Sequence, residues 1–322
     1  MFFNSSKMLF YTTMMMGIIM SISSSNWIMM WCGLEISLIS IIPLMISKSM
    51  MSSESTMKYF IIQSISSAML MMAMMIMIMK GDYNYDFLLT TSLLISTGVA
   101  PFHNWVLTVI EGLNMWMVLI TLTINKISPM TLMSYVITSV TMIMWITIMV
   151  GSMMGLNQNS IKKLIGYSSI FNMGLILMII KSNLMWIYYL IIYSVMMMLM
   201  IKLMNDMKIM FINQTVYMES MKNKMTLWTN MLSMGGMPPF MGFSIKYLVM
   251  NQMIKMNMIP LVSFMMMMSL IVMFFYLRMT FLSIMSSSII KKSLIFKLNP
   301  TTIWMLSTTL MSLPVILLTK SF

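Results

Sequence analysis

The chain has 322 residues, of which 60% are hydrophobic and only 8% are charged, and its formal net charge is +12. Soluble domains carry roughly a quarter charged residues, so this composition excludes a water-soluble globular protein. The sequence therefore predicts an all-α integral membrane protein that forms a single polytopic membrane domain over residues 1–322.

Apolar runs long enough to cross a bilayer, about 20 residues each, follow one another along almost the whole chain. The fourth run is predicted to be discontinuous near Pro101 and the ninth near Pro238 and Pro239. Lys7 and the first run resemble a signal peptide, but a second run follows at once and favours a first transmembrane helix. We predict about eleven spans, in chain order 8–24, 26–46, 58–79, 87–110, 113–137, 138–156, 160–180, 184–204, 227–256, 259–284 and 302–320.

Lysines are distributed unevenly between the two sides of the predicted bundle. The side opposite the N-terminus receives only four lysines, whereas the N-terminal side receives most of the others. The positive-inside rule places the N-terminus in the matrix or cytoplasm, and an odd number of spans then places the C-terminus outside. This asymmetry accounts for the net charge without a nucleic-acid partner, and the basic rim is expected to attract anionic lipid head groups. The four lysines are Lys80, Lys181, Lys255 and Lys320.

Methionine is unusually frequent, with 58 copies. Its flexible side chain specifies a core poorly, so packing does not explain this number. A genetic code that reads AUA as methionine, as several mitochondrial codes do, would convert many isoleucine positions. The composition therefore indicates a mitochondrially encoded protein.

The sequence offers little that could hold a cofactor. It contains one cysteine, Cys32, and one histidine, His103. These cannot build an iron–sulfur cluster or a structural zinc site, and no glycine-rich nucleotide-binding motif is present. We therefore expect this chain to bind no metal and no cofactor.

Three ionisable residues lie deep within predicted spans: Glu35, Lys126 and Lys246. A charge at the bilayer centre costs at least about 2.5–3.5 kcal/mol, so each should face protein or water. One interpretation is a set of buried ion pairs that hold helices together. Such pairs stabilise less than apolar packing, which favours a functional interpretation. Burial also disfavours the charged form, which makes protonation easier to switch, as a proton relay requires.

Prolines interrupt three of these spans. Pro101 follows Ser96, Thr97 and Gly98, two glycines precede Pro238 and Pro239, and Pro129 follows Lys126 by three residues. Proline has no amide hydrogen, so the carbonyl four residues earlier loses its helical hydrogen bond. In hydrocarbon such a carbonyl is tolerated only where protein or water donates a hydrogen bond to it. Broken helices near the midplane are typical of ion pathways in transporters. A harmless kink remains the alternative at Pro129.

Six short motifs occur in a defined order. They are WCGLE at 31–35, KYFIIQ at 58–63, GVAPFHNW at 98–105, KISP at 126–129, GLNQ at 155–158 with Lys163 and YSSI at 167–170, and PPFMGFSIK at 238–246. Each alone is weak. In this order and at this spacing they resemble the subunit 2 family of mitochondrial NADH:ubiquinone oxidoreductase, respiratory complex I, and YLR at 276–278 extends the resemblance.

The resemblance implies an antiporter-like, proton-translocating subunit of the membrane arm, an inverted-repeat bundle that lacks the first three helices. It implies that Glu35, Lys126 and Lys246 take part in proton translocation, with Lys126 as the central lysine. The implied partners are antiporter-like neighbours, small membrane subunits and phospholipids such as cardiolipin. NAD, FMN, iron–sulfur clusters and ubiquinone would lie elsewhere in the complex. The implied location is the mitochondrial inner membrane, with the N-terminus in the matrix and the C-terminus in the intermembrane space.

One position departs from the family pattern. The family usually carries a lysine where this chain has Ser96, and that lysine pairs with the glutamate. Because serine cannot become a cation, Ser96, Thr97 and Ser92 are expected to hold a water chain instead, with His103 as a further candidate. Two other functions remain open: a stand-alone cation/proton antiporter, and an inactive structural spacer in the same complex, which Ser96 supports best.

Overall fold

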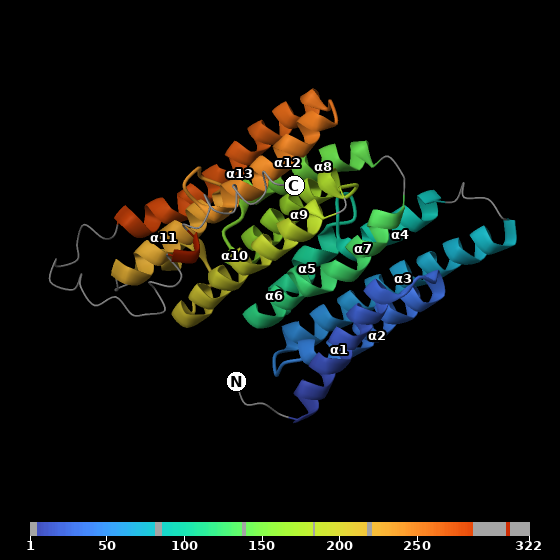
Figure 1. Ribbon diagram of the computed structural model, residues 1–322. Coiled ribbons are helices and arrows are strands. Elements are labelled where there is room, and N and C mark those ends of the chain that lie inside the picture. The colour runs from blue at the N-terminus through green and yellow to red at the C-terminus, as the bar shows by residue number, and fades with distance from the viewer. Residues whose placement is uncertain are drawn as a thin grey trace. The chain divides into compact units, whose positions relative to one another are not determined.

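The computed structural model describes residues 5–80, 86–136, 140–182, 184–217, 221–285 and 307–309. Within these ranges the regular elements are helices, and an isolated bridge joins Ser160 and Phe211. The prediction of an all-α fold is confirmed (Figure 1). The chain divides into two compact units, Met1–Ile143 (unit 1) and Met144–Phe322 (unit 2). The single polytopic domain stays a prediction, and each unit is described by itself.

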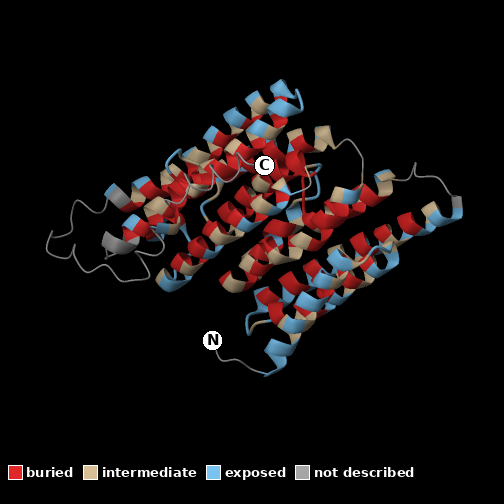
Figure 2. Ribbon diagram, viewed as in Figure 1, coloured by how far each residue is buried: buried red, intermediate tan, exposed pale blue. Residues whose placement is uncertain are grey.

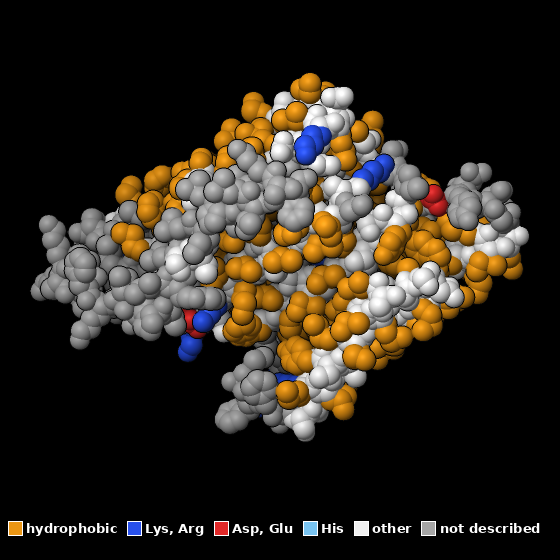
Figure 3. All heavy atoms as spheres, viewed as in Figure 1, with side chains coloured by type: hydrophobic (Ala, Val, Ile, Leu, Met, Phe, Trp, Pro, Cys, Tyr) orange, Lys and Arg blue, Asp and Glu red, His pale blue; other side chains and the backbone are white. Residues whose placement is uncertain are grey.

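The helices have the length and surface of membrane spans. Five helical stretches of the described residues are long and apolar enough to cross a bilayer: Trp27–Met45, Met50–Met79, Met115–Tyr135 (which includes a short 3-10 turn), Met185–Met207 and Ile259–Ser283. Large apolar side chains also stand on the outside of the helices, such as Ile39 at 63% exposure, and charged groups are few (Figures 2 and 3). Lipid is the environment in which such a surface is stable. The integral-membrane prediction is confirmed, whereas the count of eleven stays a prediction because the span at 302–320 lies almost wholly outside the described residues.

Unit 1 begins with an antiparallel pair of helices, α1 (Ser5–Ser23) and α2 (Trp27–Met45), joined by a short turn. The two backbones approach closely at Gly17 and Gly33, where a Cβ on Gly33 would lie 2.7 Å from the backbone oxygen of Gly17. The unit continues with α3 (Met50–Lys80), α4 (Asp86–Thr97), α5 (Asn104–Gly112), α6 (Met115–Leu122), the 3-10 helix η2 (Ile124–Lys126) and α7 (Ile127–Tyr135).

We expect Gly33→Leu to destabilise this helix pair. The added side chain meets backbone atoms of α1, which cannot rotate away, and overpacking of this kind costs about 1–3 kcal/mol or more. A lower melting temperature of the detergent-solubilised protein would show the effect. Ile39→Leu, on the exposed face of the same helix, should leave that temperature unchanged. Equal melting temperatures for the two variants would contradict the close packing as the source of stability.

Unit 2 is built around α9 (Ile161–Ile179), which is buried along most of its length. The other elements are α8 (Thr141–Met153), η3 (Met154–Asn157), α10 (Met185–Met207), η4 (Ile212–Tyr217), α11 (Met221–Gly235), α12 (Met241–Lys255) and α13 (Ile259–Met285). Arg278 of α13 donates to the backbone oxygens of Leu156 at 2.8 Å and Gln158 at 2.6 Å. It therefore fastens α13 to the loop before α9.

Two spans are discontinuous as predicted. The fourth consists of α4 and α5, and the ninth of α11 and α12. Both first halves end in the same cap, in which a glycine adopts a positive φ, 71° at Gly98 and 82° at Gly236. The amide after that glycine then donates to the carbonyl five residues earlier, Val99 to Leu94 and Met237 to Leu232. This is a Schellman motif, and the proline two or three residues further on cannot continue the helix.

A third break lies in the span over 113–137, where the sequence left a simple kink at Pro129 as the alternative. There α6 ends at Leu122, η2 follows, and α7 begins at Ile127. Pro129 stands in the first turn of α7, where its missing amide is tolerated. Because a proline at 129 leaves the carbonyl of Asn125 without a helical donor, the chain turns just before it and places Lys126 in the break.

Candidate functional site

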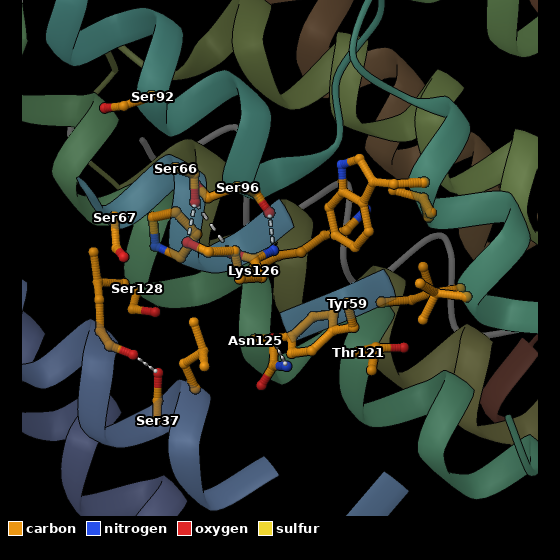
Figure 4. Close-up of a pocket in the computed structure, with 18 of the residues that line it drawn as sticks. Ser37, Tyr59, Ser66, Ser67, Ser92, Ser96, Thr121, Asn125, Lys126 and Ser128 are labelled. Atoms are coloured by element: carbon orange, nitrogen blue, oxygen red, sulfur yellow. Dashed lines mark hydrogen bonds between the residues drawn. The ribbon is translucent and has the colours of Figure 1, made fainter. Parts of the chain in front are cut away.

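A cavity of about 50 Å³ lies inside unit 1 and is lined by side chains from α2 to α7 (Figure 4). One buried water needs at least about 10–15 Å³ of such space and two to four polar partners, so the cavity has room for a few waters. No Asp or Glu lines it. Its polar side chains, apart from Lys126, are Ser37, Tyr59, Gln63, Ser66, Ser67, Ser92, Ser96, Thr121, Asn125 and Ser128.

Lys126 is the cation of this cavity. Its side chain is only 5% exposed, and its Nζ has no hydrogen-bond partner among the described residues. A buried ammonium without a partner is costly, whereas buried polar groups are nearly always bonded to protein or ordered water. The position of Lys126 in a polar cavity therefore favours bonding to internal water.

Hydrogen bonds fix the polar wall and leave acceptors pointing inward. Most cavity serines donate to the carbonyl three residues earlier in their own helix, as Ser96 does to Leu93 at 2.8 Å, so their oxygens keep free lone pairs. Asn125 Nδ2 donates to the Tyr59 hydroxyl at 3.2 Å, and Gln63 Nε2 donates to the Ser96 carbonyl at 3.0 Å. The wall can therefore accept hydrogen bonds from an ammonium or from water.

The predicted water-path residues are only partly brought together. Ser92 and Ser96 line the cavity, but Thr97 and His103 are not among its lining residues. Thr97 is buried and its hydroxyl donates to the Leu94 carbonyl at 3.2 Å. His103 lies between Pro101 and the first turn of α5, with Nδ1 3.2 Å from the Pro101 carbonyl oxygen.

Glu35 lies on α2, next to the cavity but not in its wall. Leu34, Ser37 and Leu38 line the cavity, whereas Glu35 does not. Each helical residue advances by about 100°, which turns Glu35 away from the face that carries Leu34 and Ser37. It is half-buried, and Ile39 one turn later is exposed. Glu35 therefore does not line the cavity that holds Lys126.

Lys246 occupies a separate site in unit 2, built by the break between α11 and α12. Its side chain is 7% exposed, its Nζ donates to the Gly235 carbonyl at 2.5 Å, and the same atom lies 5.8 Å from the centre of the Phe171 ring. The last carbonyls of a helix carry partial negative charge and stabilise a cation. Because Gly236 has no side chain, there is space for the end of the Lys246 side chain. A Cβ at position 236 would lie 2.8 Å from Lys246 Nζ.

Eight polar cavity residues escaped the sequence-based site prediction, among them Tyr59, Gln63 and Asn125. Tyr59 and Gln63 belong to the KYFIIQ motif, and Asn125 precedes Lys126 directly, so their place in these motifs was the available signal. Among the described residues no group of three His, Cys, Asp or Glu side chains could hold a metal ion.

Comparison with known proteins gives consistent matches. The family model described as NADH:quinone oxidoreductase/Mrp antiporter, transmembrane, matches residues 24–273. NADH-ubiquinone oxidoreductase chain 2 of Locusta migratoria is 37% identical over 298 residues, which are 88% of this chain and 87% of that protein. The protein of the same name from Bos taurus is 34% identical over 294 residues, 84% of this chain and 83% of the other.

Solved structures share the fold at low sequence identity. A chain of respiratory complex I from Thermus thermophilus has a TM-score of 0.80 and 19% identity, and the match covers 98% of this chain and 78% of that one. A chain of the membrane-bound sulfane sulfur reductase, an archaeal respiratory membrane complex, has a TM-score of 0.81 and 14% identity, with coverage of 98% and 73%.

Proposed function

The chain belongs to the NADH:quinone oxidoreductase/Mrp antiporter transmembrane family, and on this premise we propose that it is a membrane-arm subunit of NADH:ubiquinone oxidoreductase, respiratory complex I. In that complex it takes part in moving protons across the membrane while electrons pass from NADH to ubiquinone. The observation that carries the proposal is Lys126, a buried cation in a polar cavity without a hydrogen-bond partner among the described residues.

The chemistry assigned to Lys126 is reversible protonation. As an ammonium it donates to internal water, and as an amine it accepts a proton from the same water. Glu35 sets the balance between the two states through its charge, because Coulomb interactions are strong where the dielectric constant is low. A signal from quinone reduction that changes the charge of Glu35 would therefore drive a proton onto or off Lys126.

We assign to Lys246 the next proton transfer after Lys126, which moves the proton toward the outer side of the membrane or to the next subunit. In its protonated form it is held by the Gly235 carbonyl at the end of α11. Release of the proton weakens this bond, because a neutral amine gains less from a helix C-terminus. The break between α11 and α12 thus supplies the backbone carbonyl that holds the charged form of Lys246 within the membrane.

The redox groups of the complex are assigned to other subunits. NAD, FMN, the iron–sulfur clusters and ubiquinone would bind there, so this chain contributes proton movement to the enzyme. Its neighbours would be the antiporter-like and small subunits of the membrane arm, together with phospholipids such as cardiolipin. The lysine asymmetry supports a matrix N-terminus and a C-terminus in the intermembrane space of mitochondria, and the methionine content supports mitochondrial encoding. Part of that asymmetry, Lys291, Lys292, Lys297 and Lys320, lies outside the described residues.

A native gel tests membership in the complex. Membranes are solubilised in mild detergent, the gel is stained for NADH dehydrogenase activity, and mass spectrometry locates this chain. We expect it in the very large active band. Migration alone or in a small inactive assembly would contradict the proposal and favour a stand-alone cation/proton antiporter, which would exchange ions when reconstituted by itself.

A further inference from the structure

The end of helix α4 lies in the wall of the Lys126 cavity, and side chains from other helices occupy its carbonyls. Gln63 Nε2 of α3 donates to the Ser96 carbonyl at 3.0 Å. Trp105 Nε1 of α5 donates to the Ile95 carbonyl at 3.1 Å. Gln63, Ser96 and Trp105 line the same cavity as Lys126 (Figure 4). The proposed function so far gives no role to either donor.

The cap of α4 leaves the Ser96 carbonyl to a side-chain donor. The two amides that follow α4 donate to the carbonyls of Leu94 and Ile95, which come earlier in its last turn. Carbonyls at a helix end carry partial negative charge and need a partner where they are buried. Among the described residues, Gln63 is the donor that reaches the Ser96 carbonyl.

The break in unit 2 shows what a buried lysine does when such a carbonyl is within its reach. Helix α11 ends in the same cap as α4, and there the Lys246 ammonium donates to the Gly235 carbonyl at 2.5 Å. Lys126 makes no such bond, since its Nζ has no partner among the described residues. A helix-end carbonyl therefore holds Lys246, whereas neutral side chains cover the carbonyls at the helix end nearest to Lys126.

A fixed acceptor holds an ammonium more tightly than an amine, because hydrogen bonds with a charged donor are about twice as strong as neutral ones. A lysine that must give up its proton therefore releases it more easily without a fixed acceptor. We propose that Gln63 is a positioning residue that keeps the Ser96 carbonyl engaged and so allows Lys126 to release its proton. The proposal rests on the proposed function, because it concerns the proton release assigned there to Lys126.

The side-chain amide of Gln63 suits this role because it has no charge to gain or lose. Its Nε2 can donate to the Ser96 carbonyl whether Lys126 is an ammonium or an amine, so the carbonyl stays engaged in both states. An ionised carboxylate at position 63 has no hydrogen to donate, and it would itself attract the ammonium.

Trp105 does not share this role, although its ring lines the same cavity. The Ile95 carbonyl that it bonds also accepts from the Gly98 amide at 3.2 Å. Loss of the indole donor would therefore leave the Ile95 carbonyl with a backbone partner. The carbonyl that depends on one side chain is that of Ser96, and the side chain is Gln63.

Few groups in the cavity wall can change charge. The lining residues come from α2 to α7, and besides Lys126 the titratable side chain among them is Tyr59, whose hydroxyl accepts from Asn125 at 3.2 Å. Glu35 of α2 lies outside the wall. Lys126 is therefore the group through which a substitution in this wall would shift the pH dependence of the reaction.

Gln63→Met tests the role, because methionine has a similar length and no hydrogen-bond donor. The Ser96 carbonyl should then hold the Lys126 ammonium at least about tenfold more tightly, which corresponds to about one pH unit. We expect the assembled complex to oxidise NADH more slowly at neutral pH and its pH profile to move upward by about one unit. Gln252→Met is the matched control, since it makes the same change on α12, outside the cavity wall, and should keep the normal profile.

Gln63→Glu is a second variant that tests the same role. Its ionised carboxylate cannot donate to the Ser96 carbonyl and attracts the Lys126 ammonium directly. The pH profile of NADH oxidation should therefore move in the same direction as in Gln63→Met.

An assembled Gln63→Met complex with an unchanged pH profile would overturn the proposal, since a purely structural role would alter assembly and not the profile. If neither variant assembles, a high-resolution map of the unmodified complex decides. It should show the Gln63 amide on the Ser96 carbonyl, and Lys126 bonded to that carbonyl would overturn the proposal. If Lys126→Met impairs proton pumping but Gln63→Met keeps the normal profile, only the role of Gln63 fails; if Lys126→Met changes nothing, the proposed function fails.

Discussion

Replacing Lys126 with methionine is expected to slow NADH oxidation by the intact complex. Methionine has a similar length but cannot accept a proton, and loss of a positioned proton-transfer group typically slows its step by about 10²-fold or more. Because proton movement and electron transfer are coupled in the proposed function, the redox reaction slows as well. The rate of NADH oxidation with ubiquinone as acceptor measures the effect.

Assembly should survive this change. Lys126 Nζ makes no hydrogen bond within the described residues, so the variant removes a costly buried charge and no observed contact. Lys255→Met makes the same chemical change on the exposed last turn of α12 and should leave the rate unchanged. A Lys126→Met complex that is lost from the native gel would instead support the structural-spacer interpretation.

Adding one methyl group at Gly236 is expected to remove the proposed function of Lys246 in proton transfer. A Cβ there would stand 2.8 Å from the Cδ, Cε and Nζ atoms of Lys246, and the φ of 82° disfavours any residue with a Cβ. Gly236→Ala should therefore displace the ammonium from the Gly235 carbonyl. Proton pumping in sealed vesicles should fall toward the value of Lys246→Met.

The neighbouring glycine gives the control. A Cβ on Gly235 would meet only Met273 atoms, at 3.5 Å or more, which is an ordinary contact. Gly235→Ala should therefore pump normally. Equal pumping by the two alanine variants would show that the space at Gly236 is not needed by Lys246.

Backbone chemistry made the two discontinuous spans predictable. A glycine that permits a positive φ, followed within three residues by a proline, ends a helix for local reasons, so Gly98 with Pro101 and Gly236 with Pro239 could be read from the sequence. The membrane character followed from composition in the same way. The third break was predictable only as a kink at Pro129, since a lone proline does not tell whether the helix bends or stops.

The composition of the site depends on tertiary packing and was less predictable. The cavity wall combines residues from 34 to 129, and which face of α2 it meets is set by the packing of α1 and α3 against that helix. The sequence therefore named Glu35 but could not show that Ser37 and Leu38 would face the cavity instead. Polar residues such as Gln63 gain their role only from neighbours distant in sequence, here the Ser96 carbonyl.

Ser96 gives this chain a different cavity from the one that the family pattern implies. A lysine there would place a second ammonium in the wall that already contains Lys126, whereas serine adds a hydroxyl and leaves space. The cavity then has one cation and a set of neutral hydrogen-bonding groups. In this arrangement water, rather than a second lysine, would receive the proton that Lys126 releases.

Counting protons against NADH in the Lys126→Met complex tests the central claim most directly. Sealed vesicles would be used to record proton movement and NADH oxidation together, with Lys255→Met vesicles beside them. The account predicts fewer protons per NADH in the Lys126→Met vesicles at any remaining rate of oxidation. The same ratio and the same rate in both sets of vesicles would contradict a role for Lys126 in proton translocation.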